Sequence, residues 1–244
     1  MEVHAHTHTA RKKWTHYLWE FLMLFLAVFC GFLAENFREH QVEHQREKQY
    51  MQSLLADIKE DTAEINKSKL TATKAMAYQD SLIFYLYNNP PRGFLPEEFL
   101  NIDFNAMLRL KVVFNEGTAQ QLKNSGNMRL IRNPEVFRKI SLFWNEQENT
   151  TISLSRYLEY RNRGREHAEE LFAFSDQDLI EAKLVAPSDK WVRVIQTNPT
   201  LWSEYSNIVS HCHITVLNYL DQLEKLLKKA EELIQLLQKE YHLK

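Results

Sequence analysis

The chain has 244 residues, 44 % of them hydrophobic, and its 30 Lys and Arg against 32 Asp and Glu give a formal net charge of −2. This composition is ample for a packed core, and without an excess of basic residues the chain lacks the usual signature of a nucleic-acid-binding protein. Only five glycines are present, and the loops GxGxxG, GxxxxGK[ST] and GxSxG are absent, which excludes the enzyme classes built on them. So few helix breakers predict long helices and an all-α fold.

The N-terminal part of the chain carries one long apolar run, at residues 17–34. As a helix this run would span about 27 Å, close to the roughly 30 Å hydrocarbon core of a bilayer. Trp14, Tyr17 and Trp19 gather at its start, as residues at a membrane interface do. We therefore predict a transmembrane helix at 17–34, preceded by a short basic and His-rich cytoplasmic tail at 1–16.

The sequence pattern argues against two alternatives to an uncleaved membrane anchor. A helix buried in a soluble core would be amphipathic, whereas 13 of the 14 residues from Phe21 to Ala34 are apolar. A cleaved signal peptide needs a small residue where Phe32 stands before a site after Ala34, and Phe29 likewise spoils a lipoprotein site at Cys30. The patterns favour an anchor.

The flanking charges predict the orientation of this anchor. Arg11, Lys12 and Lys13 crowd the N-terminal flank, whereas Arg38 is the only Lys or Arg in the first ten positions after the run. Because the more basic flank usually stays in the cytoplasm, we expect the N-terminus inside and the remainder of the chain outside.

Two features inside the apolar run indicate interactions beyond simple anchoring. Glu20 would be an intramembrane carboxylate, and it has His16 as a partner one helical turn earlier, near the N-terminal interface. Ala27, Gly31 and Ala34 form a stripe of small residues, which lets two membrane helices approach closely. We interpret Glu20 as reaching toward the interface and the stripe as a candidate membrane-helix association face.

The rest of the chain predicts an elongated helical bundle in three parts. Residues 35–87 carry helical apolar spacing without a breaker and would continue the anchor as a helical stalk. Residues 88–133 contain three of the six prolines and three of the five glycines, and they would form an irregular, membrane-distal cap of short helices. Residues 134–244 would complete the bundle with two long helices. Asn133–Pro134 and Asn198–Pro199 are helix-start signals, and the first of these helices is expected to run back toward the membrane.

The last helix has the clearest periodicity in the chain. Apolar residues recur in steps of three and four, the spacing of a coiled-coil seam, at Val216, Leu220, Leu223, Leu227, Ala230, Ile234, Leu237 and Tyr241. Further leucines at 217, 226, 233 and 236 widen this seam beyond two positions per heptad, which favours a helix packed in a bundle.

A few side chains are typical of metal or ligand chemistry. His40, Glu43 and His44 spell HxxEH, in which two histidines one turn apart could share a zinc ion with Glu43 as general base. No third ligand is identifiable, so a solvated helix face is the simpler interpretation, and no cofactor is predicted. The alternating His4, His6 and His8 could bind a metal adventitiously.

Other candidates are more easily explained by packing. His211 and His213 lie two positions apart and so point to nearly opposite sides of a helix, with Cys212 between them. An internal disulfide between Cys30 and Cys212 is not expected. The aromatic residues Phe143, Trp144, Tyr157 and Tyr160 could line a ligand pocket, but at helical spacing such residues are more often core.

The segment from Thr118 to Leu142 resembles one that recurs in a family of uncharacterised single-pass membrane proteins of Bacteroidota. The shared pattern is a helix, a Ser-Gly-Asn-like break, a short apolar turn and a second helix start, here at Leu122, Ser125, Gly126, Asn127, Leu130, Ile131, Asn133 and Pro134. The resemblance implies a bacterial inner membrane and a periplasmic C-terminal domain. It implies no catalytic residue, because the family has no assigned activity.

Together these patterns predict a non-enzymatic, membrane-anchored helical interaction protein of the cell envelope. Its expected partners are the lipid bilayer and either further copies of the chain in a homo-oligomer or another envelope protein, with no nucleic acid. The alternative is a periplasmic ligand-sensing domain, and a third possibility is a zinc hydrolase that uses HxxEH.

Overall fold

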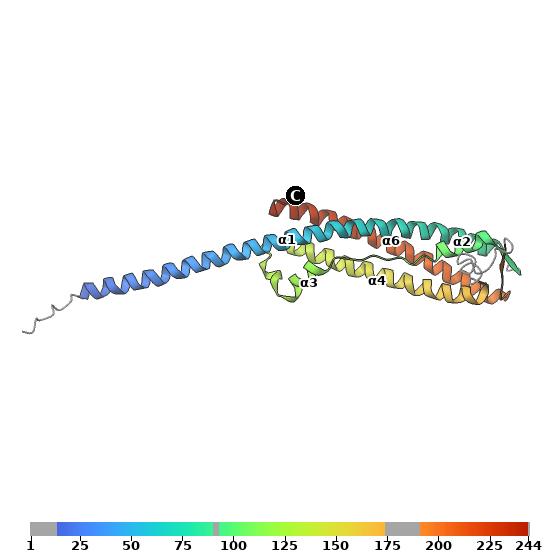
Figure 1. Cartoon of the computed structure of the whole chain (residues 1–244), viewed down its shortest axis with the longest axis horizontal. Coiled ribbons are helices and arrows are strands. Elements are labelled where there is room, and N and C mark those ends of the chain that lie inside the picture. Colours follow the sequence, from blue (N-terminus) through green and yellow to red (C-terminus); the bar gives the residue numbers. More distant parts are fainter. Residues whose placement is uncertain (1–13, 90–92, 174–190, 244) are drawn as a thin grey trace, which may run out of the picture. The chain divides into compact units, whose positions relative to one another are not determined.

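The computed structural model of the chain describes residues 14–89, 93–173 and 191–243. It divides into two units, Met1–Gln49 and Tyr50–Lys244, and we call the second the helical domain. The described residues are predominantly helical, so the predicted all-α class is confirmed. The elements are α1 Trp14–Asn88, β1 Phe94–Pro96, α2 Glu97–Ala106, α3 Gly117–Asn124, the 3₁₀ helix η1 Asn127–Leu130, α4 Pro134–Leu171, β2 Trp191–Arg193 and α6 Pro199–Tyr241 (Figure 1).

The predicted helix boundaries are confirmed at three points. α1 ends at Asn88, where the run of Asn and Pro residues begins. The side chain of Asn133 accepts hydrogen bonds from the backbone N–H of Glu135 at 2.9 Å and of Val136 at 3.4 Å, which caps α4. Asn198 caps α6 in the same way through the N–H of Thr200, at 3.0 Å. In both helices proline occupies the first turn, where its missing N–H costs nothing.

Three helical segments of the helical domain share one hydrophobic core. They are residues 50–88 of α1, the whole of α4 and the whole of α6, and each buries a stripe of side chains spaced three and four apart. Figure 1 shows these segments lying side by side. β1 and β2 form a short antiparallel ribbon that links the chain after α1 to the chain before α6.

The stripe that α6 buries is displaced from the predicted seam. Five predicted members are buried, namely Val216, Leu223, Ala230, Leu237 and Tyr241. The positions between them, however, are filled by Tyr219, Leu226 and Leu233, each with no exposed surface. The predicted Leu220, Leu227 and Ile234 are half-buried at the margin of the core. The shift arises because α6 carries apolar residues on both sides of the five shared positions. The placement of α1 and α4 decides which side is buried.

The three long helical segments do not alternate in chain direction. Gln147 of α4 bonds Asp61 of α1, while Gln79 of α1 and Arg161 of α4 bond the adjacent carbonyls of Ala106 and Met107. Residue numbers therefore increase in the same direction along both helices, so α1 and α4 are parallel. α6 runs antiparallel to α1, since Ser68 contacts Tyr219 and Asp80 contacts His213.

This arrangement corrects two expectations about residues 88–174. The segment 88–133 is not a cap at one end of the domain: it starts beside the end of α1, where the Tyr85 and Phe99 rings lie 5.0 Å apart, and finishes beside Tyr50, whose hydroxyl bonds Asn127 at 2.8 Å. α4 consequently starts level with the beginning of the domain and does not run back. Gly126, at φ +67°, provides the left-handed turn between α3 and η1.

Residues 108–116 lead the chain from the end of α2 back along α1 toward α3 and the start of α4. They form neither helix nor strand, and we call them the return segment. Gln79 and Asp61 lie about 27 Å apart along α1, and the chain covers that distance in only nine residue steps, from Ala106 to Asn115. The chain is therefore nearly fully extended, at about 3 Å per residue. Its side chains alternate accordingly, with Leu110 buried and Lys111 exposed.

An extended chain laid against helices has no neighbouring strand to satisfy its backbone, so polar side chains of the helices bond it and its junction with α2. Gln79 of α1 donates to the carbonyl of Ala106 at 2.8 Å, and Asp61 accepts from the N–H of Asn115 at 2.8 Å. From α4, the hydroxyl of Tyr157 donates to the carbonyl of Leu108 and Arg161 Nε donates to that of Met107, at 2.9 Å. These polar groups lie along the helix stripes for that reason.

We predict that Tyr157→Phe destabilises the helical domain by about 1 to 3 kcal/mol, because it leaves the carbonyl of Leu108 without its donor. Thermal unfolding of the detergent-solubilised chain, followed by circular dichroism, measures the effect. The matched control is Tyr160→Phe, one turn along α4, where the ring and not the hydroxyl makes the contact with His211. Equal stabilities of the two variants would contradict the assigned role of the return segment.

Candidate functional site

The N-terminal unit carries the predicted membrane helix. Every side chain from Trp14 to Gln41 is exposed. Within the described residues, α1 is the one helix long and apolar enough to cross a membrane, judged by length and composition, and none of its apolar window is buried. This part of α1 therefore presents a large, exposed apolar surface.

This apolar helix has two different faces. His16, Glu20, Ala27, Gly31 and Ala34 follow one another at spacings of four, seven, four and three, which places them on one face. The Nε2 atom of His16 lies 3.0 Å from Glu20 Oε1, the pair that the spacing predicts. Glu20 and Ala27 also line a shallow hollow on this face, and a Cβ atom added at Gly31 would meet no atom within 4 Å.

Phenylalanine rings occupy the opposite side. Phe21, Phe25 and Phe29 stack in succession, with ring centroids 6.3 and 5.9 Å apart. Because Phe29 is two positions from Ala27, it points nearly the opposite way around the helix. One side of the helix thus carries bulky apolar side chains, and the other side carries small side chains and the polar pair of His16 and Glu20.

The structure places the HxxEH residues on α1 without assembling a metal centre. His40 Nδ1 lies 3.9 Å from Glu43 Oε2, and His44 Nδ1 lies 3.5 Å from Glu47 Oε2. Over residues 14–89, 93–173 and 191–243, no group of three or more His, Cys, Asp or Glu side chains is arranged to hold a metal ion. His4, His6 and His8 lie outside the described residues.

The remaining sequence candidates take different roles. Phe143 and Tyr157 are core residues. The ring of Tyr160 stacks on His211 at 5.1 Å, and His213 Nε2 lies 2.8 Å from Asp80 Oδ1, so the two histidines serve different contacts. Cys212 is buried and Cys30 is exposed, and both are free thiols. Trp144 lines a pocket, which is described below.

The sequence prediction missed the buried carboxyl groups of the described helical domain, and two of them have raised pKa values. Asp103 of α2 is fully buried, accepts a hydrogen bond from the hydroxyl of Tyr205 in α6, and has Arg165 Nη1 of α4 at 3.8 Å from its Oδ2. Burial raises its pKa to about 6, against the opposing effects of the Tyr205 hydrogen bond and the Arg165 charge. Asp103 therefore ties α2 to both α4 and α6.

Asp61 is the second of these carboxyl groups. It accepts hydrogen bonds from the N–H of Asn115 at 2.8 Å and from Gln147 Nε2 at 3.0 Å. Burial raises its pKa to about 6, although the hydrogen bond from Asn115 opposes the shift. Its sequence signal is a polar residue on the apolar stripe, between Ile58 and Ile65.

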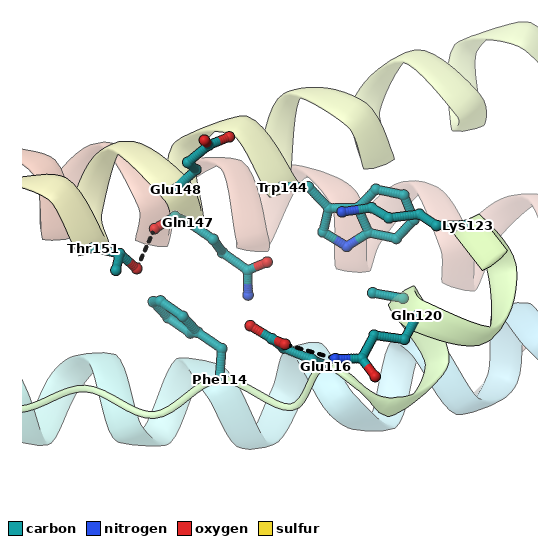
Figure 2. A pocket seen from close by; sticks show the side chains of 9 residues that line it. Phe114, Glu116, Gln120, Lys123, Trp144, Gln147, Glu148 and Thr151 are labelled. Atoms are coloured by element: carbon teal, nitrogen blue, oxygen red, sulfur yellow. Dashed lines mark hydrogen bonds between the residues drawn. The ribbon is translucent and has the colours of Figure 1, made fainter.

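A pocket of about 300 Å³ lies where the return segment and α3 meet α4 (Figure 2). α4 contributes Trp144, Gln147, Glu148 and Thr151 to its lining. The facing side comes from Phe114 and Glu116 and from Ala119, Gln120 and Lys123 of α3. The pocket therefore exists only because the return segment brings α3 back to the start of α4.

Hydrogen bonds and a ring contact hold the pocket's polar groups in place. Gln120 Nε2 donates to Glu116 Oε2 at 2.9 Å, and Lys123 Nζ lies 4.3 Å from the centroid of the Trp144 ring. The side-chain Nε2 of Gln147 donates a hydrogen bond to Asp61, and the side-chain carbonyl Oε1 therefore lies on the pocket side, as Figure 2 shows. The pocket thus offers oxygen acceptors beside an aromatic face.

Comparison with protein-family models, with curated proteins and with solved structures found no match to the chain.

We predict that the helical domain loses stability as the pH rises from about 4 to about 6.5. Asp103 has a raised pKa when folded, so the folded state holds its proton more tightly than the unfolded state, and that advantage disappears once the pH exceeds the folded pKa. A shift of about two pH units corresponds to about 3 kcal/mol. Asp61 acts in the same direction.

Chemical denaturation of the solubilised chain at pH 4.5 and pH 7.5 tests this prediction. Asp103→Asn keeps an acceptor for Tyr205 but cannot ionise, so it should reduce the difference in stability between the two pH values. The control is Asp221→Asn, at an exposed aspartate of α6 paired with Lys225. An unchanged pH dependence in Asp103→Asn would refute the assignment.

Proposed function

We propose that this protein is a single-pass membrane protein of the bacterial cell envelope, and that its helical domain acts by binding other proteins and not by catalysis. The observation that carries the proposal is the exposed apolar surface of the N-terminal unit, from Trp14 to about Phe37. Soluble proteins rarely expose contiguous apolar surface of this extent, because hydrating it is costly. Insertion into lipid removes the cost and satisfies every backbone group within the helix.

The orientation follows from the charges on either side of the span. The basic triplet at 11–13 favours a cytoplasmic N-terminus, which leaves the helical domain in the periplasm. The resemblance of residues 118–142 to single-pass proteins of Bacteroidota supports the same location.

The partner proposed for the membrane helix is a second copy of the chain. The face that carries His16, Glu20, Ala27, Gly31 and Ala34 combines small side chains with a polar pair, and both kinds of residue favour helix contacts inside a bilayer. The face with Phe21, Phe25 and Phe29 offers bulky apolar rings suited to lipid. Sequestering the polar pair between helices would remove it from the acyl chains.

A second candidate function is ligand sensing by the helical domain. The pocket between α3, α4 and the return segment favours it, because a pocket of about 300 Å³ lies at the lower end of the range for small-molecule sites. Binding there would bridge two segments that the chain brings together only through the return segment.

Membrane anchoring is tested by flotation of cell membranes on a density gradient. We expect the full-length chain to float with lipid, and the double variant Phe25→Arg/Val28→Arg to be lost from the floating fraction, since each arginine at the centre of a span costs about 3 kcal/mol. The matched control is Ile214→Arg/Leu217→Arg, at two exposed apolar residues of α6. A wild-type chain that stayed in the soluble, non-floating fraction without detergent would rule out the anchor.

Self-association is tested with the native Cys30, which precedes Gly31 and is exposed, whereas Cys212 is buried. We expect mild oxidation of membranes to yield disulfide-linked dimers, and Gly31→Leu to reduce them, because a bulky side chain on the small face separates the helices. Phe29→Leu, on the opposite side, is the control, and Cys30→Ser should abolish the product. Only monomers after oxidation and amine crosslinking, with no co-purifying partner, would contradict the proposal.

A further inference from the structure

The pocket beside Trp144 is rich in hydrogen-bond acceptors. Glu116 and Glu148 contribute two carboxylates to its lining against a single ammonium, that of Lys123. The carbonyl of Gln147 adds a neutral acceptor, and the carboxyl of Asp61 lies directly behind it, bonded to its amide nitrogen. The charge of the lining is therefore negative, and it disfavours an anionic ligand.

Two aromatic rings complete the pocket. Trp144 and Phe114 are both half-buried, and Trp144 presents its ring toward α3 (Figure 2). Indole is the side chain that attracts a cation to its face most strongly, and the attraction increases where water is partly excluded. A carboxylate together with an aromatic face is the combination that recognises ammonium and guanidinium groups.

The chain itself already places a cation there. The ammonium of Lys123 lies 4.3 Å from the centroid of the Trp144 ring, within the roughly 6 Å range of a cation–π interaction. Lys123 belongs to α3 and its side chain is exposed, so it can move aside. The geometry therefore shows that an ammonium on an alkyl stem fits over this ring.

We propose that this pocket binds an organic cation consisting of an ammonium or guanidinium group on a short alkyl chain, which replaces Lys123 over Trp144 and pairs with Glu116. The volume of about 300 Å³ limits the ligand to a few carbon atoms beyond the charged group. The same chemistry is available from a free diamine and from a basic side chain of a polypeptide. The proposal does not depend on membrane anchoring or on self-association.

Isothermal titration of the full-length chain in detergent tests the pocket with two probes. The first is 1,4-diaminobutane, and the second is Nα-acetyl-lysine methylamide, which represents a basic side chain in a polypeptide. Glutarate and butanol serve as the anionic and uncharged counterparts. We expect saturable binding of at least one cationic probe and none of the counterparts, and the probe that binds more tightly identifies the source of the cation.

Variants of the lining residues then locate the binding. Trp144→Leu and Glu116→Gln should each weaken it about tenfold, whereas Trp144→Phe keeps an aromatic face and should lose less. Lys123→Ala removes the competing ammonium and should strengthen binding by several-fold, an effect that general damage to the fold would not produce. Lys228→Ala and Glu231→Gln, at exposed positions of α6, are the matched controls.

Two results would overturn the assignment. One is the absence of heat and of any thermal shift with both cationic probes at millimolar concentration. The other is binding that Trp144→Leu and Glu116→Gln leave unchanged, which would place the cation elsewhere. Circular dichroism of each variant distinguishes a loss of binding from a loss of the fold.

Discussion

The helical domain depends on the hydrogen bonding of one extended segment. Residues 108–116 return along α1 and α4 with no strand of the described residues paired to them, so side chains bond polar groups of this stretch and of its junction with α2. Asp61 and Gln79 from α1, and Tyr157 and Arg161 from α4, supply these bonds. The same requirement explains why Asp61 and Gln79 stand among the apolar residues that α1 buries. It also makes α1 and α4 parallel, because the return is completed before α4 begins.

Two of the carboxyl groups that make tertiary hydrogen bonds in the helical domain are themselves buried: Asp61 bonds the return segment, and Asp103 bonds Tyr205 of α6. Asp61 and Asp103 are held where water is largely excluded, and burial raises the pKa of each to about 6. Three apolar stripes with the same spacing could align in more than one register, whereas a misplaced polar contact would leave a buried group unsatisfied. The ties Ser68–Tyr219 and Asp103–Tyr205 therefore align α1 and α2 with α6 through specific hydrogen bonds.

The functional proposals follow from different parts of the chain. Anchoring rests on the exposed apolar helix, and association rests on the contrast between its small, polar face and its phenylalanine face. The pocket belongs to the helical domain alone and is made by the return segment, α3 and α4. A ligand in it would contact both the segment that defines the fold and one of the long helices, which is the arrangement that a ligand-responsive domain requires.

The sequence by itself determined the helical class, the apolar run, the end of α1 at Asn88 and the starts of α4 and α6, because each depends on composition or on neighbouring residues alone. Asn133 and Asn198, each followed by proline, are local signals that need no partner. Only the tertiary structure decided the direction of α4, the displacement of the α6 stripe toward Tyr219, Leu226 and Leu233, and the pocket at Trp144. These features depend on which helix lies opposite. Apolar residues lie on both sides of the positions that α6 buries, so the sequence of α6 does not show which side is covered. Nothing local to residues 108–116 reveals that Asp61 and Tyr157, far apart in the sequence, supply hydrogen bonds to that segment.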